Sequence, residues 1–513
     1  MLVDITVTPD ELHDTALHSK MVYLKAKLSI GETTKIVLRK RSLDARKKRP
    51  LYHLRYEIVP VDAPVKSLEF DFKNVSNAEP VIIVGFGPAG MFAGLRLLEL
   101  GLKPIIFEQG NDVRTRRFDL ANITKRGIVN ERSNYCFGEG GAGTFSDGKL
   151  YTRSKKRGSV DSVLKKFVYH GASEDILIDA HPHIGTNKLP KVVQAIRQTI
   201  IDCGGEVHFN TKISSIIRDS DSCKGVVLEN GESITARAVI LATGHSARDI
   251  FTMLDRQEIA IEYKPFSLGL RVEHPQSLID SMQYHCATRH DNLPPASYAL
   301  VTQAKERGVF SFCMCPGGII CPSATNNSEV VVNGWSPSKR NSKYANSGIV
   351  VEVKESDLKP FQKHGALAGI YFQKSVEEKA AISTGGNQVA PALRLQDFVS
   401  GKISAILPDC SYIPGLQAVD FKSFLSKEFI QRLQIAFRVF NQSLQGYLTN
   451  EAIVVGVESR TSSPVRIPRD KETLQHIQLA GLFPSGEGAG YAGGIVSAAI
   501  DGENIADAVF RSL

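Results

Sequence analysis

Three glycines and one glutamate have the spacing of residues that bind a dinucleotide. Gly85, Gly87 and Gly90 follow the apolar run 81–84 in the pattern G-x-G-x-x-G. In this pattern the first glycine permits a tight turn, the second lets a pyrophosphate approach the backbone, and the third lets the next helix pack closely. Glu108 follows at roughly the 20-residue spacing of a carboxylate that accepts from ribose hydroxyls. These residue types predict a dinucleotide without a ribose 2′-phosphate, which the carboxylate would repel.

The stretch from Pro80 to Gly110 has the order of strand, helix and strand that such glycines require. Val81–Val84 is short, apolar and β-branched, which predicts a buried parallel strand. Met91–Leu100 is a mostly apolar helix that Gly101 ends, and Lys103–Glu108 is a second strand. We therefore expect the backbone of one turn to contact the pyrophosphate, through Gly85, Gly87, Pro88, Ala89 and Gly90.

Two later segments are also rich in glycine. FGEGGAGTFSDGKL, residues Phe137–Leu150, has five glycines, which would be costly in a packed helix. It is either a mobile surface loop or a loop whose N–H groups face a planar or anionic ligand. Ser485–Gly502, SGEGAGYAGGIVSAAIDG, leads into a C-terminal helix whose positive N-terminus can face the same ligand. Between these segments a buried strand, 236–242, runs into the turn Ala242-Thr243-Gly244 and brings it beside the first turn.

The order of these motifs resembles that of the glutathione-reductase-type flavoproteins, which have two dinucleotide-binding domains and bind FAD. This resemblance covers most of residues 80–250 and 455–513. The segments FGEGGAGTFSDGKL, ATGHSARD, FCMCPGG, GGNQVAPA and ESRTSSPVRI are similar to those of a family described only as uncharacterised FAD-dependent dehydrogenases. That second resemblance covers nearly the whole chain. It implies FAD as the cofactor but leaves the reaction open. Our hypothesis is an enzyme that moves hydride between the flavin and a small organic substrate, which could be an anion.

The resemblance also implies roles for individual residues around FAD. Glu487 stands where the family usually has Asp, and it is expected to bind ribityl or phosphate-bridging groups. Ile213 resembles a strand residue that packs near adenine. A helix N-terminus near the pyrimidine edge of the flavin would stabilise negative charge that develops on reduction. The further residues that the resemblance places at the cofactor are Gly141, Gly143, Thr144, Ser146, Ala242, Thr243, Gly244, Gly486, Gly494 and Ile495.

Two absent patterns limit the chemistry. There is no second G-x-G-x-x-G between a strand and a helix, so a built-in NAD(P)H domain is not expected, and NAD(P)H could act only as a diffusible reductant. There is also no C-x-x-C or C-x-x-x-x-C pair for a dithiol relay. Cys313, Cys315 and Cys321 could together bind a metal ion, but no fourth ligand stands beside them, so buried thiols and no metal are predicted.

Three residues are candidates for catalysis. His245 adjoins the 242–244 turn, although a histidine near a sheet end is often structural. Arg460 and Arg466 lie in the polar loop 458–470, which resembles the family's flavin-side substrate loop. They could clamp a carboxylate, or they could pair with acidic groups of the protein surface.

The pattern of elements predicts an α/β protein with three parts. Residues 1–75 read as a small α/β module, with Thr8 and Glu11 as a capping box for a helix to Met21. Residues 76–250 and 455–513 read as a Rossmann-like FAD-binding domain. Residues 251–454 mix strands and helices and read as an inserted α+β substrate domain.

Composition agrees with a globular protein. The 513 residues are 42% hydrophobic and 23% charged. Acidic residues interrupt the opening segment, no apolar run reaches the length of a membrane span, and the eight cysteines are scattered. We therefore expect a cytoplasmic enzyme with a small-molecule substrate and, in one reading, a separate electron acceptor.

The formal charge of +8 suggests a second function to be tested. Much of the excess lies in a basic run from Arg39 to Arg49, between the expected strands 35–41 and 51–59. Such a run is usually a solvated connection, but clustered cations also release counterions from phosphate. The alternative is a flavoprotein whose N-terminal module binds RNA or another acidic partner. Aromatic residues are absent from the run, which weakens this alternative.

Overall fold

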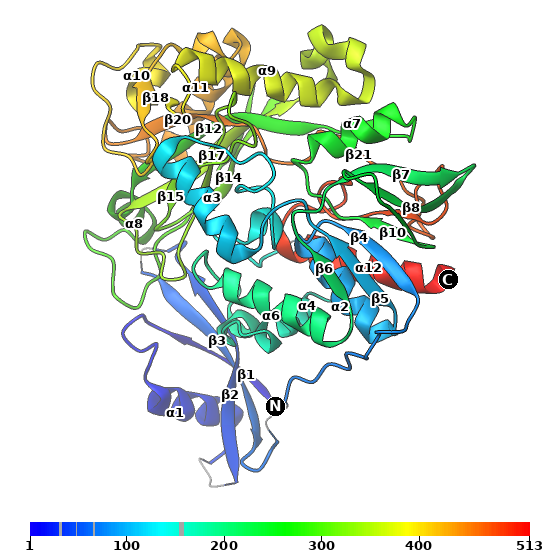
Figure 1. The fold of residues 1–513 in the computed structure, drawn as a ribbon. Helices are drawn as coiled ribbons and strands as arrows, with labels where there is room; N and C mark the ends of the chain where they lie inside the picture. The colour runs from blue at the N-terminus through cyan, green and yellow to red at the C-terminus, as the bar shows by residue number, and fades with distance from the viewer. Residues whose placement is uncertain (30–32, 48, 65–66, 153–157) are drawn as a thin grey trace.

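The computed structural model describes residues 1–29, 33–47, 49–64, 67–152 and 158–513 as a mixed α/β protein (Figure 1). The expected first strand and helix are present as β4 (Pro80–Val84) and α2 (Pro88–Leu100). They belong to a five-stranded parallel sheet in the order β22-β10-β4-β5-β6. Its other strands are β5 (Lys103–Phe107), β6 (Glu206–His208), β10 (Val239–Leu241) and β22 (Leu482–Pro484).

Both faces of β4 are buried, as a continuous β-branched run requires. Val81 and Ile83 pack in a core with the helices α2, α4 (Val160–Tyr169), α6 (Leu189–Asp202) and α12 (Ile495–Ser512). Ile82 and Val84 pack in a second core on the opposite face. That core is covered by an antiparallel sheet of β7 (Ile213–Asp219), β8 (Ser222–Leu228) and β9 (Ser233–Thr235), and by α7 (Arg248–Arg256).

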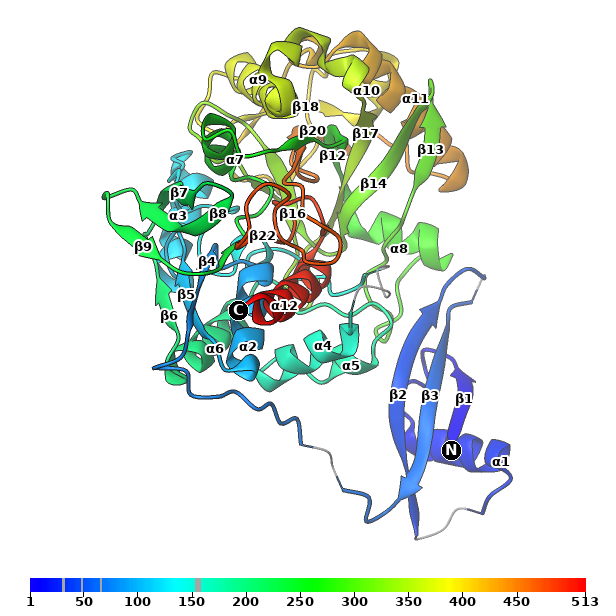
Figure 2. The same ribbon diagram turned by 90° about the vertical axis from the view of Figure 1, so that its right-hand side faces the viewer.

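The middle of the chain forms a seven-stranded sheet in the order β13-β14-β17-β12-β20-β18-β19. The strands are β12 (Phe266–Pro275), β13 (Val301–Ala304), β14 (Arg307–Cys315), β17 (Tyr344–Val353), β18 (Ala390–Arg394), β19 (Leu416–Ala418) and β20 (Ile453–Glu458). The helices α9 (Ala368–Ser383), α10 (Leu395–Ser400) and α11 (Lys427–Ser443) gather on this sheet (Figures 1 and 2). The expected boundary between residues 454 and 455 falls inside β20, because that strand pairs with β12 and β18.

Shorter elements complete the described chain. The helices are α3 (Val113–Arg126), α5 (Asp175–Ile178), α8 (Gln276–Tyr284), η1 (Gly141–Gly143), η2 (Glu355–Leu367) and η3 (Phe421–Ser423). The strands are β11 (Glu262–Tyr263), β15 (Ile319–Pro322), β16 (Val332–Trp335) and β21 (Val465–Arg466). Among the described residues, no helix combines the length and the apolar character needed to cross a membrane.

The N-terminal module lies at one end of the molecule in both views (Figures 1 and 2). Its three strands, β1 (Leu2–Val7), β2 (Thr34–Asp44) and β3 (Leu51–Pro60), pair in the order β1-β3-β2, and α1 spans Thr15–Ala26. The predicted start of α1 at Thr8 is wrong. The Glu11 carboxylate does accept from the Thr8 N–H and hydroxyl, but it closes a separate turn, and Asp14 caps the helix.

The prediction that the basic run only connects two strands is also partly wrong, because β2 continues into the run as far as Asp44. Three arginines of the run are paired with carboxylates. Arg39 contacts Glu57 at 2.7 Å, Arg41 contacts Asp179 at 2.7 Å, and Arg46 contacts Asp44 at 2.8 Å. Lys48 lies outside the described residues. The pairing reduces the positive charge that this part of the module presents.

Helices α2 and α12 lie side by side (Figure 2) and pack so closely that one glycine is required between them. A Cβ at Gly502 would lie 2.1 Å from the Ala89 carbonyl oxygen. We expect Gly502→Ala to destabilise the protein by about 1–3 kcal/mol, because overpacking outweighs the gain in helix propensity. Thermal unfolding should show a lower Tm. Gly308→Ala is the control, since its Cβ would have no neighbour closer than 3.9 Å; equal Tm values for the two variants would contradict the expectation.

Candidate functional site

A cavity of about 360 Å³ lies where the glycine-rich segments meet the seven-stranded sheet. Its walls come from parts of the chain that are far apart in sequence. The β4–α2 turn, the loop around η1, the turn after β10 and the start of α12 all line it. Phe312 and Cys313 of β14 line it from the seven-stranded sheet, and Asn333 lines it from β16, which pairs with β15 in a separate two-stranded sheet. The cavity therefore connects the expected cofactor segments to the middle of the chain.

The glycine-rich segments touch one another through their backbones. A Cβ at Gly85, where φ is +99°, would lie 2.5 Å from the Ala242 carbonyl oxygen. A Cβ at Gly141 would lie 3.1 Å from the Gly87 Cα, and one at Gly488 would lie 2.6 Å from the Gly244 carbonyl oxygen. Glycine is needed at these contacts because any side chain would push the segments apart.

Glu108 directly follows β5 and lines the cavity as a residue that is 5% exposed. Its carboxylate accepts from the backbone N–H groups of Phe86, Gly110 and Gly138, at 2.9, 2.9 and 3.0 Å. A carboxylate can accept about four hydrogen bonds. Glu108 therefore holds the first turn against the second glycine-rich loop, in addition to facing the cavity where a ribose was expected.

Three of the predicted cofactor residues support the cavity without lining it. Gly90 allows α2 to approach the turn, because a Cβ there would lie 2.0 Å from the Gly85 carbonyl oxygen. Thr144 is buried and its hydroxyl donates to the Glu139 carbonyl oxygen. The N–H of Gly486 donates to Asp501 at 2.7 Å. The predicted cofactor residues that do line the cavity are Gly85, Gly87, Pro88, Ala89, Glu108, Gly141, Gly143, Ser146, Ile213, Ala242, Thr243, Gly244, Glu487, Gly494 and Ile495.

Sequence reasoning missed the ion pair that anchors the third glycine-rich segment. Asp501 lies in α12, and its carboxylate is bound on both oxygens by Arg469, at 2.6 and 3.0 Å. The same carboxylate accepts from Gly486 N. The available signal was an acidic residue directly after the mostly apolar run 495–500, since a buried carboxylate needs partners.

His245 lines the cavity beside Glu487, with 3.7 Å between His245 Nε2 and Glu487 Oε2. Its Nδ1 lies 3.2 Å from the Ser246 hydroxyl. Burial lowers the pKa of His245, and the charges of Arg460 and Arg248 act in the same direction, against the attraction of Glu487. His245 is therefore a neutral imidazole at pH 7.

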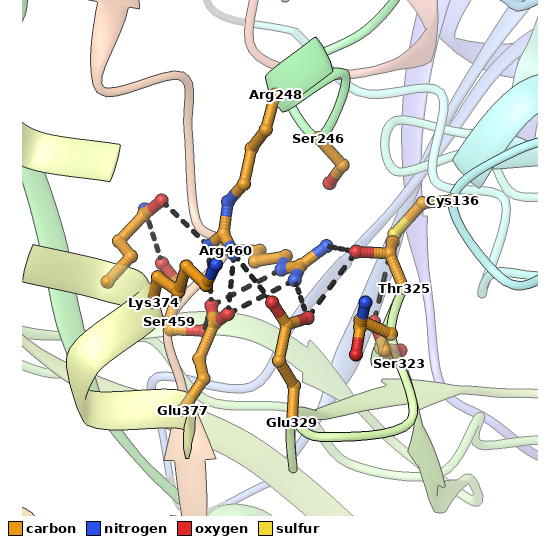
Figure 3. A network of polar contacts seen from close by, with 12 residues as sticks. Cys136, Ser246, Arg248, Ser323, Thr325, Glu329, Lys374, Glu377, Ser459 and Arg460 are labelled. Carbon is orange, nitrogen blue, oxygen red and sulfur yellow. Dashed lines mark hydrogen bonds and ion pairs between the residues drawn. The ribbon is translucent and has the colours of Figure 1, made fainter. Parts of the chain in front are cut away.

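Of the two interpretations of Arg460, the pairing with acidic groups has support in the structure, because two buried glutamates hold its guanidinium (Figure 3). Arg460 Nη2 lies 2.7 Å from Glu329 Oε2 and 3.1 Å from Glu377 Oε2. Arg248 contacts the same two carboxylates, at 3.0 and 2.9 Å. The partners are buried acids rather than the surface acids of the alternative interpretation. Arg466 does not line the cavity and is exposed.

In the Arg248–Arg460–Glu329–Glu377 network each of the two guanidinium groups contacts both carboxylates (Figure 3). Burial alone would raise the pKa of Glu377, but the charges of Arg248 and Arg460 outweigh it and lower that pKa to about 2. Burial and the neighbouring Glu377 raise the pKa of Glu329. The network joins α7, the loop after β20 and α9, so it ties the part beside the parallel sheet to the seven-stranded sheet.

Removing the Glu377 charge from this network leaves two buried arginines with Glu329 as their shared carboxylate partner. We expect Glu377→Gln to destabilise the protein by about 3–5 kcal/mol, measured as a fall in the urea concentration at the unfolding midpoint. The matched control is Glu378→Gln on the same helix. Glu378 is partly exposed and lies 3.7 Å from Lys374, so its loss should change stability by less than about 0.5 kcal/mol. A similar midpoint for both variants would show that the network adds no stability.

The three cysteines considered as metal ligands differ in their surroundings. Cys315 and Cys321 are buried. Cys313 is exposed where it lines the cavity, although protein surrounds its thiol. Burial raises the pKa of Cys313 and of Cys321 to about 12, so both are protonated thiols. Within the described part of the chain, no group of three or more His, Cys, Asp or Glu side chains is arranged to hold a metal ion.

Three segments of the chain match family descriptions. Residues 265–461 match "FAD-dependent protein, C-terminal domain-like", residues 182–310 match "FAD dependent oxidoreductase", and residues 2–59 match a domain of unknown function. A protein of Clostridium beijerinckii, described as uncharacterised, is 38% identical over 522 residues, which cover 97% of this chain and 96% of that relative.

Solved structures resemble the chain more distantly. Glycine oxidase from Geobacillus kaustophilus is 13% identical, with 85% of this chain and 95% of that chain covered and a TM-score of 0.35. A geranylgeranyl bacteriochlorophyll reductase-like protein from Thermoplasma acidophilum is also 13% identical, with 85% and 79% covered and a TM-score of 0.34. These TM-scores are too low to carry a functional conclusion.

Proposed function

Because the chain belongs to the family of the Clostridium beijerinckii protein and contains FAD-dependent oxidoreductase domains, we propose that this flavoenzyme is a dehydrogenase that moves hydride between flavin and a small organic substrate. One observation carries the proposal. A single cavity is lined by the glycine-rich segments and continues to β14 and β16. We assign the glycine-rich side to FAD and the side of the seven-stranded sheet to the substrate.

The cavity fits a dinucleotide at the first turn. A Cβ at Gly87 would have no protein atom closer than 3.9 Å, so the packing of the protein does not require glycine there. Gly87 does line the cavity, where the backbone must be approached closely by a pyrophosphate. The N-termini of α2 and α12 also border the cavity, and their positive ends favour negative groups.

Each group of residues then has a proposed role. The first turn holds the pyrophosphate and Glu108 the adenosine ribose, while Ile213 packs near adenine. Glu487 holds the ribityl hydroxyls. The backbone of Gly494 and Ile495 faces the negative charge that develops on the flavin when it is reduced. When bound, FAD supplies a hydride acceptor and donor. His245 remains our candidate for proton transfer, because its neutral Nε2 can accept a proton from a substrate hydroxyl or amine.

We also propose a division of the chain by role. Residues 76–250 and 455–513 form the Rossmann-like FAD-binding domain, residues 251–454 cover the substrate side, and residues 1–75 form a separate small module. The boundary expected between residues 454 and 455 moves to the end of β20, since residues up to Glu458 belong to a strand of the seven-stranded sheet. The RNA-binding alternative has no supporting observation, because Arg39, Arg41 and Arg46 already pair with carboxylates.

Anaerobic reduction tests the proposed reaction. The yellow holoenzyme should lose its oxidised-flavin absorbance when mixed with one member of a panel of small hydroxy acids, amino acids, alcohols, NADH and NADPH. A metabolite that bleaches the flavin is a substrate, and bleaching by NADH or NADPH identifies a diffusible reductant. A protein that binds FAD but is bleached by none of these compounds would contradict the dehydrogenase proposal, whereas a protein that binds no FAD would contradict the assignment of the cavity.

Gly87→Ala separates cofactor binding from folding. The added methyl group has room within the protein but projects into the path of the pyrophosphate. We expect at least about a tenfold weaker affinity for FAD, measured by titration of the apoprotein with fluorescence detection, because a lost close contact of about 1.4 kcal/mol is a factor of ten. The Tm of the apoprotein should match that of the wild type. An unchanged FAD affinity would place the pyrophosphate elsewhere.

A further inference from the structure

The cationic side chains that line the cavity differ in whether a carboxylate neutralises them. Among the described residues these side chains are Lys149, Lys212 and Arg460. Lys212 lies 2.9 Å from the carboxylate of Asp249, and Arg460 is held by its two glutamates. Lys149 is the cation at the end of the cavity formed by the second glycine-rich loop and β14.

In the part of the chain that the structure describes, the charge of Lys149 is not matched by a carboxylate of its own. Its ammonium group donates to the Met314 carbonyl oxygen, and Asp147 Oδ2 is 3.9 Å away. Asp147 is already bound on both oxygens by Arg340, at 3.2 and 2.7 Å. Arg340 therefore balances Asp147, and one positive charge is left over beside the cavity.

The neighbouring thiols do not supply the missing negative charge. Cys313 and Cys315 both line this end of the cavity. Burial raises the pKa of both thiols, that of Cys313 to about 12, despite the opposing effect of Lys149. They are neutral at pH 7, so the lysine charge stays uncompensated.

A bulge in β14 presents backbone carbonyl groups at the same place. The pairing of β14 with β17 shifts between Phe312 and Cys315, and Cys313 has a φ of +44°. Such bulges redirect side chains and are common next to active sites. Two cations hold consecutive carbonyl groups of this bulge: Arg271 donates to Cys313 O at 3.4 Å, and Lys149 donates to Met314 O.

Arg271 also orients Asn333, which lines the cavity from β16. The Asn333 Oδ1 accepts from Arg271 Nη2 at 3.2 Å and from Gly334 N at 2.7 Å. With its oxygen occupied in this way, Asn333 has its NH₂ group left as a donor. Lys149 binds the bulge directly and Asn333 is linked to it through Arg271, so the two offer a cation and a neutral donor near one bulge, which suits a carboxylate.

We propose that Lys149 and Asn333 bind the carboxylate of the substrate, in place of the arginines that the sequence suggested. This assignment of the carboxylate site rests on the proposed function, since it assumes that FAD fills the rest of the cavity. The substrate class is then a small organic acid. A competing role for Lys149, stabilising negative charge on reduced flavin, predicts a different measurement.

Carboxylate binding can be measured without knowing the substrate. The FAD-loaded protein is titrated with acetate and with benzoate, and binding is followed by the change in the visible flavin spectrum. We expect saturable binding of at least one of them, weakened tenfold or more in Lys149→Met and largely restored in Lys149→Arg. Asn333→Leu should weaken it as well. Lys212→Met is the matched control, because it removes the same charge from the other end of the cavity and should leave carboxylate affinity unchanged.

The flavin reduction potential separates the two roles of Lys149. In the proposed role, Lys149→Met changes carboxylate affinity and leaves the potential of the ligand-free holoenzyme unchanged. A shifted potential with unchanged carboxylate affinity would overturn the proposal in favour of flavin stabilisation. Absence of acetate and benzoate binding to the yellow wild-type protein would also overturn it, without affecting the proposed function, which fails only if FAD does not bind or is not reduced.

Discussion

The structure depends on backbone contacts that glycine alone permits. Gly85 packs on the carbonyl of Ala242, Gly141 on the Cα of Gly87, and Gly488 on the carbonyl of Gly244. Each contact joins segments that are distant in sequence. Because these segments meet without side chains between them, their N–H groups and helix ends border one continuous cavity. The glycine pattern thus creates both the fold of this region and the surface on which a dinucleotide can lie.

Charge pairing divides the cavity into regions of different function. The buried network of Arg248, Arg460, Glu329 and Glu377 uses its two positive charges to hold two parts of the chain together. Those arginines are therefore structural. Lys149 is different, because the nearby Asp147 is already paired with Arg340. A ligand carboxylate would find its counter-charge at Lys149 and not in the arginine network.

Elements close to the glycines could be predicted well, and elements far from them less well. The positions of β4, α2 and β5 follow the expected ranges within one to three residues, because turn residues and apolar runs act locally. The capping box at Thr8 formed a turn instead of a helix start, since Asp14 supplied a competing cap. The strand β20 crossed the expected boundary because its partners, β12 and β18, lie far away in sequence.

The sequence alone determined that a G-x-G-x-x-G turn, a carboxylate after the second strand and two more glycine-rich segments are present, which together predicted a dinucleotide. The resemblance of these segments to those of FAD-dependent dehydrogenases implied that it is FAD. These are local patterns, and their spacing carries the chemistry. The tertiary structure decided which of the described cationic side chains at the cavity has a carboxylate of its own. Arg460 and Lys149 cannot be ranked from sequence, because Arg460 meets Glu329 and Glu377 through contacts between residues more than 80 positions apart. Lys149 is set apart by the long-range pairing of Asp147 with Arg340, which lies 193 positions away.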